Sequence, residues 1–138
     1  MAQFFEFVSN HLLLVGTFVA LLIAFFINES KRGGAAISAQ NLVRLFNQGE
    51  AVILDIRDEK EFRQGHITGS ISIPYGSLDS RVAELDKYKE KTIVIVCKMG
   101  QHAGAAGRKL KELGYLDVKR LTGGLAEWSA LSMPLVKK

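Results

Sequence analysis

Residues 92–104 read TIVIVCKMGQHAG and contain the densest strand signal in the chain. Thr92 to Val96 are all β-branched, which is typical of a strand that is buried on both faces of a parallel sheet. The run leads directly into Cys97, and the small residues that follow predict a tight loop and then a helix over residues 104–113, ended by Gly114. This stretch therefore predicts a strand–loop–helix unit with the cysteine at the carboxyl end of the strand.

Similar patterns on both sides of this unit predict an alternating series of strands and helices. Such alternation over about 100 residues favours an α/β fold with a parallel sheet flanked by helices. The further elements expected are a helix after the N-cap Ser38, ended at 47–49; a strand at 51–56; a short helix at 59–64, capped by Asp58 and closed by Gly65; a loop and strand at 66–74; an amphipathic helix at 79–88; a strand at 118–121; and a helix at 125–131.

The N-terminal part has a different composition from the rest of the chain. Residues 12–27 carry no charge, and extension back to Phe7 gives the ~20 residues that cross a bilayer core. We expect a tail and transmembrane helix at 1–28, with residues 7–27 in the membrane, a flexible linker at 29–37 and a domain at 38–138. A signal peptide and a buried core helix are the alternatives.

Charge asymmetry around this helix predicts its orientation. Lys31 and Arg32 follow it directly, whereas no lysine or arginine precedes it. Positive residues stay on the cytoplasmic side, so we expect a single-pass protein of the cell inner membrane with its C-terminal domain in the cytoplasm.

Composition excludes several classes of function. The net charge of +4 comes from lysines interspersed with acids, without the clustering of a nucleic-acid interface. A single cysteine excludes an intramolecular disulfide and a CxxC redox pair. The three histidines are far apart in sequence, so we expect no metal site and no cofactor.

Cys97 is the candidate reactive residue. In open parallel sheets, ligands bind outside the carboxyl ends of the strands. A loop that turns its backbone N–H groups inward, followed by a helix N-terminus, forms an anion cradle that favours a thiolate. The alternative is that Cys97 is a small apolar residue that closes a buried strand.

Three ordered segments of the chain resemble the rhodanese-like domain family. Residues 52–74 (VILDIRDEKEFRQGHITGSISIP) are similar to its first signature, residues 93–97 with Gly100 to its active-site strand and loop, and residues 121–134 (LTGGLAEWSALSMP) to its C-terminal segment. Bacterial rhodanese-like proteins with one membrane anchor share this layout. The resemblance implies a sulfurtransferase in which Cys97 takes sulfane sulfur from a thiosulfate-type donor as a persulfide and passes it to a thiol or cyanide.

The same resemblance implies the roles of the residues around Cys97. The binding loop consists of Lys98, Met99, Gly100, Gln101 and His102. Asp55 and Arg57 are expected as a supporting pair near this loop, and His66 and Trp128 as structural residues.

The loop departs from the family pattern at two positions. His102 stands where many active members have Arg, and Ala103 replaces a common hydroxyl residue, so Lys98 is the remaining cation of the loop. The alternative function is a non-catalytic binding module that recruits a protein partner at the membrane. A cysteine phosphatase is discounted because it needs an arginine at position 103.

Overall fold

The computed structural model describes residues 1–137, and it divides the chain into two compact units, Met1–Lys31 and Arg32–Lys138.

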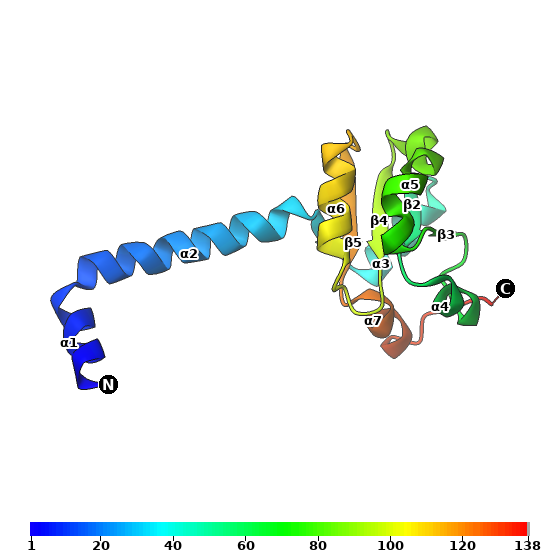
Figure 1. Ribbon diagram of the computed structural model, residues 1–138. Helices are drawn as coiled ribbons and strands as arrows, with labels where there is room; N and C mark the ends of the chain where they lie inside the picture. The colour runs from blue at the N-terminus through cyan, green and yellow to red at the C-terminus, as the bar shows by residue number, and fades with distance from the viewer. Residues whose placement is uncertain (138) are drawn as a thin grey trace. The chain divides into compact units, whose positions relative to one another are not determined.

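The second unit is built on a five-stranded, fully parallel sheet (Figure 1). The strand order is β1-β5-β4-β2-β3, so β4 lies at the centre. This arrangement confirms the predicted α/β class. The strands are β1 (Ala35–Ile37), β2 (Ala51–Asp55), β3 (Ile71–Ser72), β4 (Thr92–Val96) and β5 (Asp117–Leu121).

Helices cover both faces of this sheet and create two apolar cores. Along β4, Ile93 and Ile95 point into one core, while Val94 and Val96 point into the other, as the two-residue period of a strand requires. The helical elements are α3 (Ala39–Asn47), α4 (Glu59–Gln64), η1 (Tyr75–Ser77), α5 (Leu78–Arg81), η2 (Val82–Tyr88), α6 (Ala103–Glu112) and α7 (Gly124–Ala130).

Most helix boundaries agree with the sequence expectations, with two corrections. The Ser38 side chain accepts a hydrogen bond from Asn41 N and caps α3 as predicted, but the Asp58 side chain makes no such bond to α4. Residues 79–88 do not form one α-helix, because α5 ends at Arg81 and a 3₁₀ segment follows. The three-residue spacing of Val82, Leu85 and Tyr88 explains this, since a 3₁₀ helix has three residues per turn.

The predicted linker over residues 29–37 is wrong at its C-terminal end. Residues 35–37 form β1, which pairs with β5 at the edge of the sheet. Gly34 has φ +99°, and a Cβ there would collide with the Val118 carbonyl. The glycines before β1 therefore allow the backbone to pack closely against neighbouring segments. The sequence had suggested a flexible linker at these positions.

The first unit contains α1 (Ala2–Asn10) and all but the last residue of α2 (Leu12–Arg32). Leu12–Glu29 is long and apolar enough to cross a membrane by length and composition, a test that a signal sequence near an N-terminus also passes. The helix breaks at His11, so residues 7–10 of the predicted span lie in α1. The candidate span is thus shifted toward the C-terminus relative to the predicted residues 7–27.

Candidate active site

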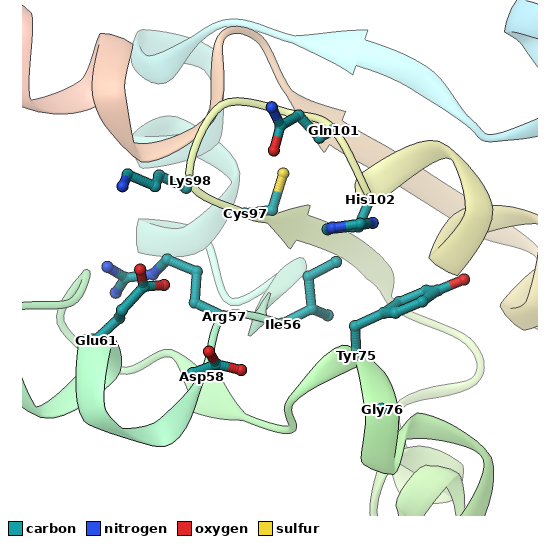
Figure 2. A pocket seen from close by; sticks show the side chains of 10 residues that line it. All are labelled: Ile56, Arg57, Asp58, Glu61, Tyr75, Gly76, Cys97, Lys98, Gln101 and His102. Atoms are coloured by element: carbon teal, nitrogen blue, oxygen red, sulfur yellow. The ribbon is translucent and has the colours of Figure 1, made fainter.

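Cys97 lies directly after β4 and lines a pocket of about 330 Å³ (Figure 2). Its residue is only 3% exposed, so the thiol is reached through this pocket. The lining residues come from the carboxyl ends of neighbouring strands, as expected for an open parallel sheet. They are Ile56, Arg57, Asp58, Glu61, Tyr75, Gly76, Cys97, Lys98, Gln101 and His102.

The start of α7 fixes the loop that follows Cys97. The carbonyl oxygens of Cys97 and Lys98 accept hydrogen bonds from Leu125 N at 2.8 Å and Ala126 N at 2.9 Å. Gly124 permits this contact, because a Cβ there would lie 2.5 Å from the Cys97 oxygen and 2.8 Å from Gly100 N. Two of the loop carbonyls are thereby held against α7.

The N–H groups of the same loop remain available to a ligand. Within residues 1–137, no backbone hydrogen bond is donated by the N–H groups of residues 98–102, and α6 begins immediately afterwards at Ala103. Free amides and the positive end of a helix dipole both favour an anion. The anion cradle expected from the sequence stays a prediction, which these two features support.

Asp55 and Arg57 form the expected pair beside the pocket. Arg57 Nη2 lies 2.8 Å from Asp55 Oδ2, and Arg57 Nε lies 3.0 Å from Asp55 Oδ1. Arg57 Nη2 also donates to the Gly65 carbonyl at 2.7 Å. The guanidinium lines the pocket, but its charge is largely offset by the Asp55 carboxylate.

Acidic and basic side chains both line the pocket. Asp58 and Glu61 come from the segment after β2, whereas Lys98 and His102 belong to the loop (Figure 2). In the described part of the chain, neither of these two carboxylates has a hydrogen-bond or ion-pair partner for its side chain. Figure 2 also shows that Lys98 extends away from the Cys97 sulfur. The pocket is therefore not uniformly cationic.

His102 is stacked on an aromatic ring at the pocket wall. The His102 and Tyr75 ring centroids are 5.1 Å apart and the planes differ by 20°. Lys109 Nζ lies 5.0 Å from the centroid of the Tyr75 ring and 3.0 Å from Asp79 Oδ2. The hydrogen bond from Lys109 to Asp79 raises the Lys109 pKa, so this ammonium stays charged beside the tyrosine.

Comparison with known proteins agrees with this geometry. A family model described as the rhodanese-like domain matches residues 38–131, which include the cysteine loop and the segment that forms α7. The chain belongs to the rhodanese-like domain family.

Individual relatives extend this comparison. The "Uncharacterized protein YibN" of Escherichia coli is 32% identical over 141 residues and is covered to 99%, as is this chain. The "Thiosulfate sulfurtransferase PspE" of the same species is 33% identical over 84 residues, which cover 61% of this chain and 77% of PspE. A rhodanese-related protein from Thermoplasma volcanium superimposes with a TM-score of 0.68 at 28% identity, covering 75% of this chain and 99% of that structure.

The rhodanese-like domain brings together most, but not all, of the predicted site residues. Cys97, Lys98, Gln101, His102 and Arg57 share the pocket. Of the other predicted residues, Met99 is 59% exposed, while Gly100 and Asp55 lie outside the pocket lining.

Four lining residues with side chains were missed by the sequence reasoning, namely Ile56, Asp58, Glu61 and Tyr75. A signal for three of them was present, because residues 56–61 follow β2 and thus start at the same sheet edge as Cys97. The same signal was present for Tyr75, which directly follows the strand predicted within residues 66–74.

His66 and Trp128 have the structural roles that were expected. His66 Nδ1 lies 2.8 Å from the Phe62 carbonyl, and its ring is stacked on Phe62. Trp128 is buried, and its Nε1 donates to the Pro134 carbonyl at 3.1 Å. Neither residue lines the pocket around Cys97.

Proposed function

We propose that this protein is a sulfurtransferase that carries sulfane sulfur as a persulfide on Cys97. The observation that carries the proposal is the position of the thiol, which lines an open pocket at the start of a loop whose N–H groups donate no backbone hydrogen bond within residues 1–137. The named activity of the relative PspE, a thiosulfate sulfurtransferase, supports the same reaction class.

The proposed reaction has two half-steps. The Cys97 thiolate attacks the outer sulfur of a thiosulfate-type donor, the S–S bond of the donor breaks, and sulfite leaves. A thiol or cyanide then attacks the outer sulfur of the persulfide, and Cys97 leaves as a thiolate. The loop N–H groups stabilise negative charge on sulfur in both half-steps.

Mass spectrometry of the full-length chain in detergent tests this proposal. Thiosulfate is expected to add one sulfur, about 32 Da, to Cys97 as a reversible persulfide. Cys97→Ser is expected to take up none, because a hydroxyl is a far poorer nucleophile at neutral pH. The proposal is rejected if no donor adds sulfur and Cys97 reacts with alkylating agents no faster than a free thiol.

A non-catalytic binding module is the second candidate. Asp58 and Glu61 on the pocket wall, and His102 where many active members have Arg, weaken the attraction for a dianionic donor. A module of this kind would retain the fold and recruit a protein partner without forming a persulfide.

We also propose that α2 anchors the domain in the cell inner membrane as a single span. The apolar stretch Leu12–Glu29 supports the anchor, and Lys31 and Arg32 after it favour a cytoplasmic domain. The protein is then expected to resist extraction by alkaline carbonate. A C-terminal reporter that works only in the cytoplasm is expected to be active, whereas activity of a reporter restricted to the outside reverses the proposed topology.

A further inference from the structure

The acceptor half-step requires a proton to move. A thiol attacks as its thiolate, while the outer sulfur of the persulfide accepts a nucleophile more readily once it is protonated. A single group that takes the proton from the acceptor and returns it to the outer sulfur serves both needs. Histidine is the residue type whose ordinary titration range suits such a transfer near neutral pH.

His102 lines the same pocket as Cys97. It is the only histidine among the described residues that line the pocket of Cys97. Figure 2 shows its imidazole extending from the loop toward the Cys97 side of the pocket, with the Tyr75 ring on its other side. The Tyr75 hydroxyl points away from the cysteine in the same view, so Tyr75 contacts His102 through its ring and its hydroxyl is not placed to transfer a proton to Cys97.

Tyr75 restricts the orientation of this imidazole. The near-parallel stack, with ring centroids 5.1 Å apart, limits rotation of the His102 ring. The backbone of Tyr75, at the start of η1, is held by the hydrogen bond that Tyr75 N donates to the Ile56 carbonyl at 2.9 Å. The Lys109–Asp79 pair packs beside the same ring. His102 is exposed at the mouth of the pocket, and the stack on Tyr75 is the contact that orders its ring there.

We propose that His102 transfers the acceptor's proton and that Tyr75 is the positioning residue for it. This inference rests on the proposed function. In the step, His102 removes the proton of R–SH and delivers it to the anionic outer sulfur of Cys97–S–S⁻. The thiolate then attacks that sulfur, the S–S bond of the persulfide breaks, and the products are R–S–SH and the Cys97 thiolate. One negative charge is present before and after the step, and no further reagent is consumed.

Two acceptors that differ in their proton test this inference. The full-length protein in detergent is first loaded with thiosulfate, freed of donor, and checked by mass for the added sulfur. Loss of that sulfur is then timed with 2-mercaptoethanol, which must give up a proton, and with sulfite, which carries none at mildly alkaline pH.

In His102→Gln, discharge to 2-mercaptoethanol is expected to slow by about 100-fold, the range of general acid–base catalysis, while discharge to sulfite changes by less than about threefold. Tyr75→Leu is expected to lower the ratio of the discharge rate with 2-mercaptoethanol to the discharge rate with sulfite. Tyr75→Phe is expected to keep the wild-type ratio, because phenylalanine retains the stacked ring. His11→Gln, a histidine of the first unit, is the matched control and is expected to leave both rates unchanged.

The outcomes separate the two proposals. If wild type takes up no sulfur, the proposed function itself fails. If wild type loads normally but His102→Gln slows both acceptors equally, or neither, the proton-transfer role of His102 is overturned. If Tyr75→Leu leaves the ratio unchanged, the positioning role of Tyr75 is overturned.

Discussion

The carboxylate of Asp55 and the guanidinium of Arg57 form an ion pair of 2.8 Å next to the cysteine pocket, with side-chain exposures of only 1% and 9%. The pair satisfies the buried carboxylate at the end of β2 and also ties Arg57 to the Gly65 carbonyl after α4. Because Asp55 offsets the charge of Arg57, we expect any attraction of an anion toward Cys97 to depend mainly on the loop 98–102 and the start of α6.

Asp55→Asn is expected to destabilise the fold. The substitution leaves Arg57 nearly buried without its counter-charge, a situation that costs about 3 kcal/mol of unfolding free energy. Urea unfolding of the variant and wild type measures the difference. Arg63→Ala, which breaks the exposed Arg63–Glu59 pair, is the matched control and should cost less than about 1 kcal/mol. Equal losses in the two variants contradict the structural importance of the Asp55–Arg57 pair.

His102→Arg is expected to increase the rate of sulfur uptake from thiosulfate. Arginine adds a permanent, fork-shaped cation to the loop, and a gain of about tenfold corresponds to about 1.4 kcal/mol of transition-state stabilisation. The measurement is the loading rate at limiting thiosulfate. His102→Lys is the control, with a smaller gain expected because an ammonium lacks the fork. Unchanged or slower loading in His102→Arg argues against an anion-binding loop.

Removal of β1 is expected to weaken the domain. A chain that begins at Ser38 lacks the pairing of β1 with β5 and the buried Ile37, which contributes about 2 kcal/mol through apolar burial. A chain that begins at Arg32 retains both, so its urea midpoint should be higher. Ile37→Ala in the longer chain is expected to reproduce much of the loss. Identical midpoints for the two truncations show that β1 contributes nothing to stability.

Tyr115 is expected to couple stability to alkaline pH. Its buried hydroxyl lies 3.0 Å from Asp86 Oδ1 and 3.1 Å from the Val82 carbonyl. Burial, together with the hydrogen bond to Asp86, raises the pKa of Tyr115 to about 12 from its ordinary value of 10.0.

The neutral phenol is favoured in the folded state, so its contribution is complete below pH 10 and is lost as the pH rises toward about 12. The loss is on the order of 2 kcal/mol. It is measured as the difference in unfolding free energy between wild type and Tyr115→Phe across this window, which cancels the titration of other groups. A difference that stays constant with pH contradicts the coupling.

Local patterns in the sequence were sufficient for most elements. The β-branched run of β4 and the capping hydroxyl of Ser38 act within a few residues, so their consequences were readable before any tertiary contact was known. The motifs around Cys97 likewise located the loop, since strand, loop and helix follow one another in the chain. The prediction of a flexible linker at the glycines before β1 was wrong. The contact that requires a glycine there is made with β5, a strand far away in the sequence, so the local sequence does not reveal it.

The environment of Cys97 was decided by the tertiary structure. Strand order places the end of β2 beside the end of β4 and the end of β3 one strand further, so that Asp58, Glu61 and Tyr75 line the pocket of the thiol. The hydrogen bonds from Leu125 and Ala126 that hold the loop also join segments far apart in the chain. The sequence by itself therefore determined most of the α/β elements, the presence of a candidate span and the place of the cysteine loop in the chain. The pocket wall and the stack of Tyr75 on His102 depend on contacts between distant segments, which form only when parallel crossovers pack against the sheet.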